Sequence, residues 1–252
     1  MQRKTMLKWL SLFIFVCFFS CQSSKKGKAF QDPFYLYRLG VLHFQEGHLE
    51  DAEKNLRESV RLNPKNAPAL NALGLTYLTM GRYEDAKLYF EKAIKEMPSY
   101  SDAYNNLGVT YLQTNDLQKA EECFNKAKED TIYNFMPNVW FNLGLIKEKQ
   151  KRYEEAIAFF SEAIKKKENY PIAYLRRGIV YQNLNKLSDA LQDLKKYNEM
   201  VKDDSEGLYQ LGKCLVSLKQ IEEGKTYLEK AYFLNPKSEV GILAKKLMEM
   251  LP

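Results

Sequence analysis

The chain has 252 residues, of which 45% are hydrophobic and 28% charged, and its formal net charge is +6. This size allows a substantial buried core, and the small numbers of glycines (12) and prolines (8) favour helices. Three of the cations lie in the first 20 residues, which leaves about +3 on the rest of the chain. A charge this small and dispersed argues against nucleic-acid binding. The composition as a whole predicts an all-α protein.

The N-terminus, MQRKTMLKWLSLFIFVCFFSC, combines a basic start with an apolar run from Trp9 to Phe19. The run is shorter than the about 20 apolar residues that a membrane-spanning helix needs. Residues 1–20 are therefore predicted to be a secretory signal peptide. The run ends in Ser20 and Cys21 and resembles a bacterial lipobox, although Phe18 stands where Leu is usual. The alternative is an ordinary signal in which Cys21 is incidental.

The resemblance to lipoproteins implies that Cys21 is acylated and becomes the first residue of the mature chain. Because Gln22 rather than Asp follows it, the resemblance also implies sorting to the outer membrane, facing the periplasm. Acyl chains contribute about 0.8 kcal/mol per buried CH₂, so two or three together would hold the protein on the membrane. Residues 21–32 would then be a flexible tether.

Small residues recur at a nearly constant interval through residues 33–238. The glycines stand 34, 34, 36, 34 and 34 residues apart, at Gly40, Gly74, Gly108, Gly144, Gly178 and Gly212. Twelve residues after each glycine stands Ala, or Gly in the last copy, and four residues later Leu or Phe. Such positions let two antiparallel amphipathic helices approach closely, so the interval predicts six two-helix repeats.

The segment NALGLTYLTMGRYEDAKLYFEKAIKEMP closely resembles the tetratricopeptide repeat (TPR). The resemblance covers residues 33–238 and implies a right-handed superhelix, an α-solenoid of six helix-turn-helix repeats, closed by a C-terminal capping helix at 239–252. Repeats five and six depart from the pattern at Arg177 and Lys202, so we expect them to pack less tightly. The predicted repeats span 33–66, 67–100, 101–136, 137–170, 171–204 and 205–238.

Few residues of the repeats suggest chemistry. His43 occupies the position that is Tyr in three other repeats, so it is predicted to be a packed aromatic residue, and His48 a solvated turn residue. Cys123 and Cys214 are predicted to be small apolar residues without a disulfide. Since the sequence has no nucleophile elbow, phosphate loop or zinc motif, we expect no enzyme, cofactor, metal ion or small-molecule substrate.

A second apolar stripe follows the first helix of each repeat at i, i+4 and i+7. In TPR proteins these positions line the concave groove, so the resemblance implies that the stripe binds a protein or peptide segment, with asparagines bonding its backbone. The alternative is that neighbouring repeats partly bury the stripe. The predicted groove residues are Tyr37, Val41, Phe44, Asn71, Leu75, Leu78, Asn105, Val109, Leu112, Phe141, Asn142, Leu145, Leu175 and Ile179.

The one longer interval lies in KEDTIYNFMPNVWFNLGLIKEKQKRYEEA, between repeats three and four. It predicts a longer loop that holds Tyr133, Phe135 and Met136, with Pro137 opening the next helix. This segment resembles the same junction in the pilotins of type IV pilus biogenesis, which are TPR lipoproteins with six repeats. The matching residues are Asp130, Thr131, Tyr133, Asn142, Leu143, Gly144 and Leu145.

The pilotin resemblance implies a protein that helps a secretin subunit reach the outer membrane or assemble there. Two alternatives stay open. One is a general adaptor of the bacterial cell envelope that recruits other proteins, such as peptidoglycan-processing enzymes. The other is an enzyme or sugar-binding protein built on the same repeats, which would need an acidic or aromatic pocket.

Overall fold

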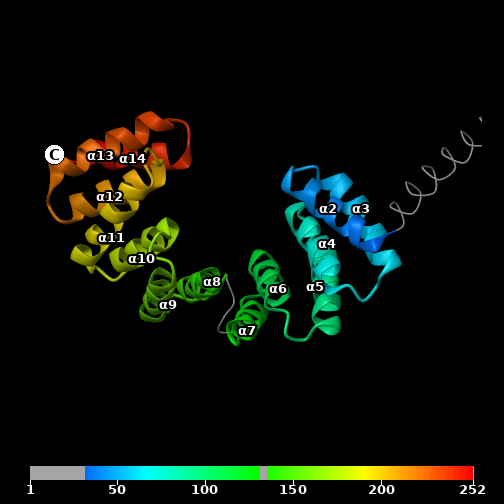
Figure 1. The fold of residues 1–252 in the computed structure, drawn as a ribbon. Helices are drawn as coiled ribbons and strands as arrows, with labels where there is room; N and C mark the ends of the chain where they lie inside the picture. The colour runs from blue at the N-terminus through cyan, green and yellow to red at the C-terminus, as the bar shows by residue number, and fades with distance from the viewer. Residues whose placement is uncertain (1–31, 131–134, 252) are drawn as a thin grey trace, which may run out of the picture. The chain divides into compact units, whose positions relative to one another are not determined.

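The computed structural model describes residues 32–130 and 135–251. These residues form thirteen helices and no strand (Figure 1). The predicted signal peptide, Cys21, nearly all of the predicted tether, Thr131 and Tyr133 lie outside the described residues.

Each predicted repeat contains two helices, although α8 begins one residue before the predicted start of repeat four. The first helices are α2 (Pro33–Gln45), α4 (Ala67–Thr79), α6 (Ser101–Gln113), α8 (Met136–Lys149), α10 (Pro171–Asn183) and α12 (Ser205–Ser217). The second helices are α3 (Leu49–Leu62), α5 (Tyr83–Glu96), α7 (Leu117–Lys128), α9 (Tyr153–Lys166), α11 (Leu187–Met200) and α13 (Ile221–Leu234). A last helix, α14 (Glu239–Glu249), packs on α13 and α12.

The chain forms two compact units, which divide between Asn115 and Asp116. In unit 1, α2 packs on α3 and α4 on α5, while α4 also contacts α2 and α6. In unit 2, the pairs α8–α9, α10–α11 and α12–α13 pack together, and each second helix also contacts the first helix of the next repeat. This alternation of contacts within and between neighbouring repeats is typical of stacked repeat proteins.

The glycine in the first helix allows the two helices of a repeat to touch. A Cβ atom on Gly74 would lie 2.7 Å from Cε1 of Phe90, and one on Gly144 would lie 2.6 Å from Cε1 of Phe160. Both phenylalanines are completely buried. The spacing of glycine and aromatic residue in the sequence therefore corresponds to a real close approach.

The turn inside a repeat has a recurring set of backbone bonds. In the first repeat the N–H of Gly47 donates to the carbonyl of Phe44 (3.1 Å), and the N–H of His48 donates to that of His43 (2.9 Å). This pair of bonds is the Schellman motif, which ends a helix with one residue in the left-handed conformation. That residue has a φ between 57° and 80° in all six turns, at Gly47, Gly81, Asn115, Lys151, Asn185 and Lys219.

The lengthened interval changes the ends of two helices. Helix α7 has 12 residues, whereas the other second helices have 14. Met136 is not a loop residue, as the sequence predicted, but the first residue of α8, where its side chain is buried. Pro137 follows in the first turn, where its missing N–H costs no hydrogen bond.

Candidate functional site

Nine of the predicted groove residues lie in unit 1, on the adjacent helices α2, α4 and α6. Eight of the nine are half-buried, so part of each side chain is accessible. Tyr37 and Val41 also line a surface depression of about 680 Å³ along α2, beside the exposed Phe34 and Leu42. The half-buried residues are Tyr37, Val41, Phe44, Leu75, Leu78, Asn105, Val109 and Leu112.

The asparagines of unit 1 bond to one another. The side-chain N–H of Asn106 donates to the oxygen of Asn71 (3.1 Å), and that of Asn105 donates to the oxygen of Asn106 (3.4 Å). Asn71 is only 9% exposed, so its amide is engaged between repeats instead of being open to a guest. Next to it, burial raises the pKa of Tyr100 to about 12. These polar groups fix the spacing of α4 and α6.

The groove residues of unit 2 pack against buried clusters of their own unit. The ring of Phe141 lies 5.5 Å from the rings of both Phe160 and Tyr170, and Leu145 packs against the same cluster. Leu175 is 4% exposed within a core cluster, and Ile179 packs against that cluster. Asn142 is half-buried. Of these five residues only Leu175 is buried, and the other four keep part of their surface accessible, as in unit 1.

Two charged pairs that the sequence did not suggest lie beside the stripe in unit 2. Nζ of Lys147, whose side chain is 4% exposed, lies 2.6 Å from a carboxylate oxygen of Glu121. Arg176 donates two hydrogen bonds to Glu148, at 2.8 and 3.1 Å. A buried charge needs such a partner, because leaving it unpaired costs several kcal/mol. These pairs tie α7 to α8 and α8 to α10.

The cysteines of the described part, Cys123 and Cys214, form no disulfide. Cys214 is buried, and burial raises the pKa of its thiol to about 11. It therefore remains a neutral, apolar side chain at physiological pH.

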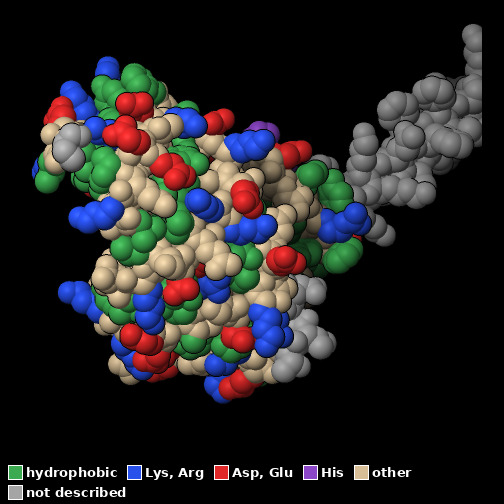
Figure 2. Space-filling model, turned by 90° about the vertical axis from the view of Figure 1, so that its left-hand side faces the viewer, with side chains coloured by type: hydrophobic (Ala, Val, Ile, Leu, Met, Phe, Trp, Pro, Cys, Tyr) green, Lys and Arg blue, Asp and Glu red, His purple; other side chains and the backbone are tan. Residues whose placement is uncertain are grey.

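The turn between α2 and α3 brings two histidines and a carboxylate together: His43, Glu46 and His48. From the sequence, His43 and His48 are expected to have separate roles, and Glu46 is not among the predicted site residues. On the face drawn in Figure 2, Lys and Arg side chains are interspersed with Asp and Glu. Among the described helices, none is both long and apolar enough to span a bilayer.

A comparison of the sequence with models of known domain families agrees with the helix pairs and turns described above. Residues 18–246 match the family model of the Cilia and flagella-associated protein 70 C-terminal domain, which consists of tetratricopeptide repeats. The chain belongs to this TPR family. A comparison of this TPR protein with curated sequences returns no match.

Three solved structures resemble this TPR protein. PilF of Pseudomonas aeruginosa has a TM-score of 0.79 at 20% identity, covering 85% of this chain and 97% of its own. PilW, described as a widely conserved type IV pilus biogenesis factor, has a TM-score of 0.78 at 20% identity, covering 84% and 98%. YrrB, described as a TPR protein with an unusual peptide-binding site, has a TM-score of 0.61 at 21% identity, covering 76% and 97%.

These likenesses confirm the predicted all-α TPR fold and, at the level of the fold, its resemblance to the pilus biogenesis proteins. TPR folds present extended surfaces that bind protein or peptide partners. The chain is thus a TPR protein of the scaffold type.

Proposed function

We propose that this protein is a non-catalytic, membrane-anchored scaffold that binds a secretin subunit and promotes its assembly in the outer membrane during type IV pilus biogenesis. The observation that supports this proposal most is the likeness to PilF and PilW, whose TM-scores of 0.79 and 0.78 and coverage of 85% and 84% of this chain exceed the 0.61 and 76% of YrrB. The likeness also spans 97% and 98% of their own chains, so it extends beyond a single shared repeat.

The proposed binding surface is the groove face of unit 1, formed by α2, α4 and α6. Its apolar side chains are half-buried, so each has area left to cover, and Tyr37 and Val41 also line the depression along α2. Burying apolar surface contributes about 25 cal/mol per Å², which would supply the affinity for the partner. An apolar stripe of this kind can accept an extended or a helical segment.

The proposed anchor is an acylated Cys21, which lies outside the described residues. Confining the scaffold to the membrane raises its effective concentration for a partner that is assembled there. The proposed location is the bacterial cell envelope, on the periplasmic face of the outer membrane. In this role the protein needs no cofactor and no catalytic residue.

Crosslinked affinity capture from native membranes tests the proposal. The full-length protein carries a C-terminal affinity tag, and mass spectrometry identifies the proteins that it retains. We expect enrichment of a secretin, together with fewer secretin multimers when the scaffold gene is deleted. Enrichment of peptidoglycan-processing enzymes without a secretin would instead support the general envelope adaptor and contradict the pilus role.

A further inference from the structure

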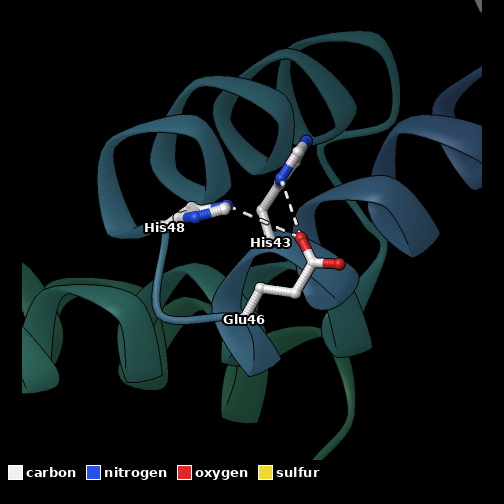
Figure 3. A group of neighbouring side chains, drawn as sticks. All are labelled: His43, Glu46 and His48. Carbon is white, nitrogen blue, oxygen red and sulfur yellow. Dashed lines mark ion pairs between the residues drawn. The ribbon is translucent and has the colours of Figure 1, made fainter.

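The turn between α2 and α3 directs two imidazole rings at one carboxylate (Figure 3). Nδ1 of His48 lies 3.5 Å and Nδ1 of His43 lies 3.7 Å from the same oxygen, Oε2 of Glu46. Each residue offers one ligand atom, and these three atoms all lie within 4.8 Å of one another. Two nitrogens and one oxygen are thus arranged around a common point.

The separations fit a bound metal ion better than direct hydrogen bonds. Both exceed the about 3.2 Å expected of an N–H···O bond. Zinc bonds of about 2.0–2.2 Å at a tetrahedral angle place two ligand atoms roughly 3.3–3.6 Å apart. The observed distances to Oε2 are 3.5 and 3.7 Å. A small movement of the side chains would therefore complete the coordination.

One atom of the cluster lacks a hydrogen bond. Nδ1 of His43 is buried and makes no hydrogen bond within the described part of the chain. Buried polar atoms are nearly always hydrogen-bonded or bound to an ion or water, so such an atom needs an explanation. A metal ion between His43 and Glu46 would supply its missing interaction.

The backbone fixes the three residues relative to one another. The N–H of His48 donates to the carbonyl of His43 at 2.9 Å, and Gly47 between them adopts a φ of 80°. Glu46 ends α2 and His48 precedes α3, so the ligands sit on a closed turn instead of a loose loop. A site whose ligands are held in place loses little conformational entropy when the ion binds.

The corresponding positions of the other repeats do not carry this set. In the second repeat they are Tyr77, Met80 and Arg82, and the guanidinium of Arg82 lies 4.3 Å from the ring of Tyr77. In the second repeat, a contact between an aromatic ring and a guanidinium is therefore sufficient at these positions. Two imidazoles and a carboxylate go beyond that requirement, and their combination is confined to the first repeat.

We propose that His43, Glu46 and His48 bind a divalent transition-metal ion, with Zn²⁺ the best match to this nitrogen and oxygen set. Three protein ligands leave the fourth tetrahedral position to water. The ion would link the end of α2 to the start of α3, next to the groove residue Phe44. Because it binds the folded turn, it would stabilise the first repeat.

Titration of the metal-free protein with Zn²⁺ alone tests this site. The protein is purified through an affinity tag that is cleaved off before the titration, and isothermal titration calorimetry measures stoichiometry and affinity. We expect one Zn²⁺ per chain. His43→Tyr, which introduces the residue of the second repeat, and Glu46→Gln should each weaken binding by at least about tenfold, since even outer-shell partners of a metal change affinity by that much.

Glu168→Gln is the matched control, because Glu168 is an exposed carboxylate in a turn of unit 2. It should bind Zn²⁺ like the parent. Unchanged one-to-one binding by the double variant His43→Tyr with His48→Gln would overturn the proposal, as would a parent protein that binds no Zn²⁺. Circular dichroism verifies that the variants are folded.

A second measurement needs no substitution. The chain contains only two histidines, so its imidazole signals in a ¹H–¹⁵N spectrum are few and assignable. Stoichiometric Zn²⁺ should shift the signals of both rings. Signals that stay in place while calorimetry records binding would assign the ion to another site and refute the proposal.

Discussion

Arg177 on α10 and Asp193 on α11 form a two-bond ion pair in the interior of unit 2. Nε and Nη2 of Arg177 lie 2.7 and 2.8 Å from the two carboxylate oxygens, and Nη1 donates to Oγ of Ser161 at 2.8 Å. The side chain of Asp193 is 6% exposed. Burial opposes the charge of Arg177, but the bonds and charge of Asp193 outweigh it and raise the pKa of the guanidinium.

The pair explains why repeat five departs from the repeat pattern. Arg177 stands where four other repeats have a buried leucine, and Asp193 stands where Tyr89 and Tyr227 lie in the second and sixth. The two departures thus compensate each other. The expectation that Arg177 loosens its repeat overlooked this partner.

Replacing Arg177 alone should be strongly destabilising. In Arg177→Leu the carboxylate of Asp193 stays buried without its partner, which we expect to cost about 3–5 kcal/mol. Adding Asp193→Tyr removes the stranded charge and should recover most of the loss. Urea unfolding followed by circular dichroism measures both variants.

The control for this cycle is Arg152→Leu. Arg152 pairs with Glu155 on the surface, with side chains 51% and 48% exposed, so the loss should stay below about 1 kcal/mol. A single Arg177→Leu variant as stable as the parent would show that the buried pair contributes nothing.

Two glycines of the second repeat should differ in their tolerance of substitution. Gly74→Ala would bring a methyl group to within 2.7 Å of the buried ring of Phe90. Overpacking costs about 1–3 kcal/mol, which outweighs the about 1 kcal/mol that alanine gains over glycine inside a helix. Thermal unfolding should therefore show a lower Tm.

Gly81→Asn is the matched change in the turn. Gly81 has a φ of 74° with open space around its Cβ position, and Asn115 and Asn185 adopt φ values of 60° and 57° in equivalent turns. We expect a change within about 0.5 kcal/mol. A Gly74→Ala variant that is more stable than Gly81→Asn would show that α4 and α5 do not need glycine for their close approach.

The groove face of unit 1 can be tested by adding charge. Leu75→Glu combined with Val109→Glu places two carboxylates on α4 and α6, where the side chains are half-buried. Loss of two apolar contacts that a partner covers should reduce capture of that partner about tenfold or more. Leu88→Glu on α5, where Leu88 is 45% exposed, is the control. Helical content and partner capture that both stay unchanged in the double variant would remove this face from consideration.

Cys21→Ser tests the anchor. Without an acyl chain, the protein should move from the membrane fraction to the soluble fraction. The reason is that each CH₂ buried in the membrane contributes about 0.8 kcal/mol to binding, and the variant loses this contribution. Cys17→Ser is the control, since Val16 before Cys17 makes it a poorer acylation site. Full membrane retention of Cys21→Ser would contradict acylation at this residue.

The sequence was sufficient for the positions of the helices but not for the details of the irregular junction. Two helices fall in each predicted repeat, since the interval of the glycines reflects contacts that recur in every copy. Met136 was misplaced because a proline at position 137 predicts a helix start there, while the buried side chain of Met136 adds one residue to α8.

The stripe pattern predicts the exposure of individual side chains less well than it predicts the fold. The stripe pattern gives Leu75 and Leu175 the same position in their repeats, yet Leu75 is half-buried and Leu175 is 4% exposed. Exposure depends on how bulky the neighbouring helices are at that point. A pattern read along one helix contains no information about the next one.

By itself, the sequence determined the repeat, its two helices and its turns, because each of these depends on residues that lie close together in the chain. Only the tertiary structure decided which polar groups meet. Arg177 and Asp193 are 16 residues apart, and Lys147 and Glu121 are 26 residues apart, each pair on two different helices. The convergence of His43 and His48 on Glu46 likewise required the backbone of the turn, because a φ of 80° at Gly47 turns the chain back on itself there. Charge pairing and metal coordination depend on distances of a few ångströms between atoms, and folding, not spacing along the chain, sets those distances.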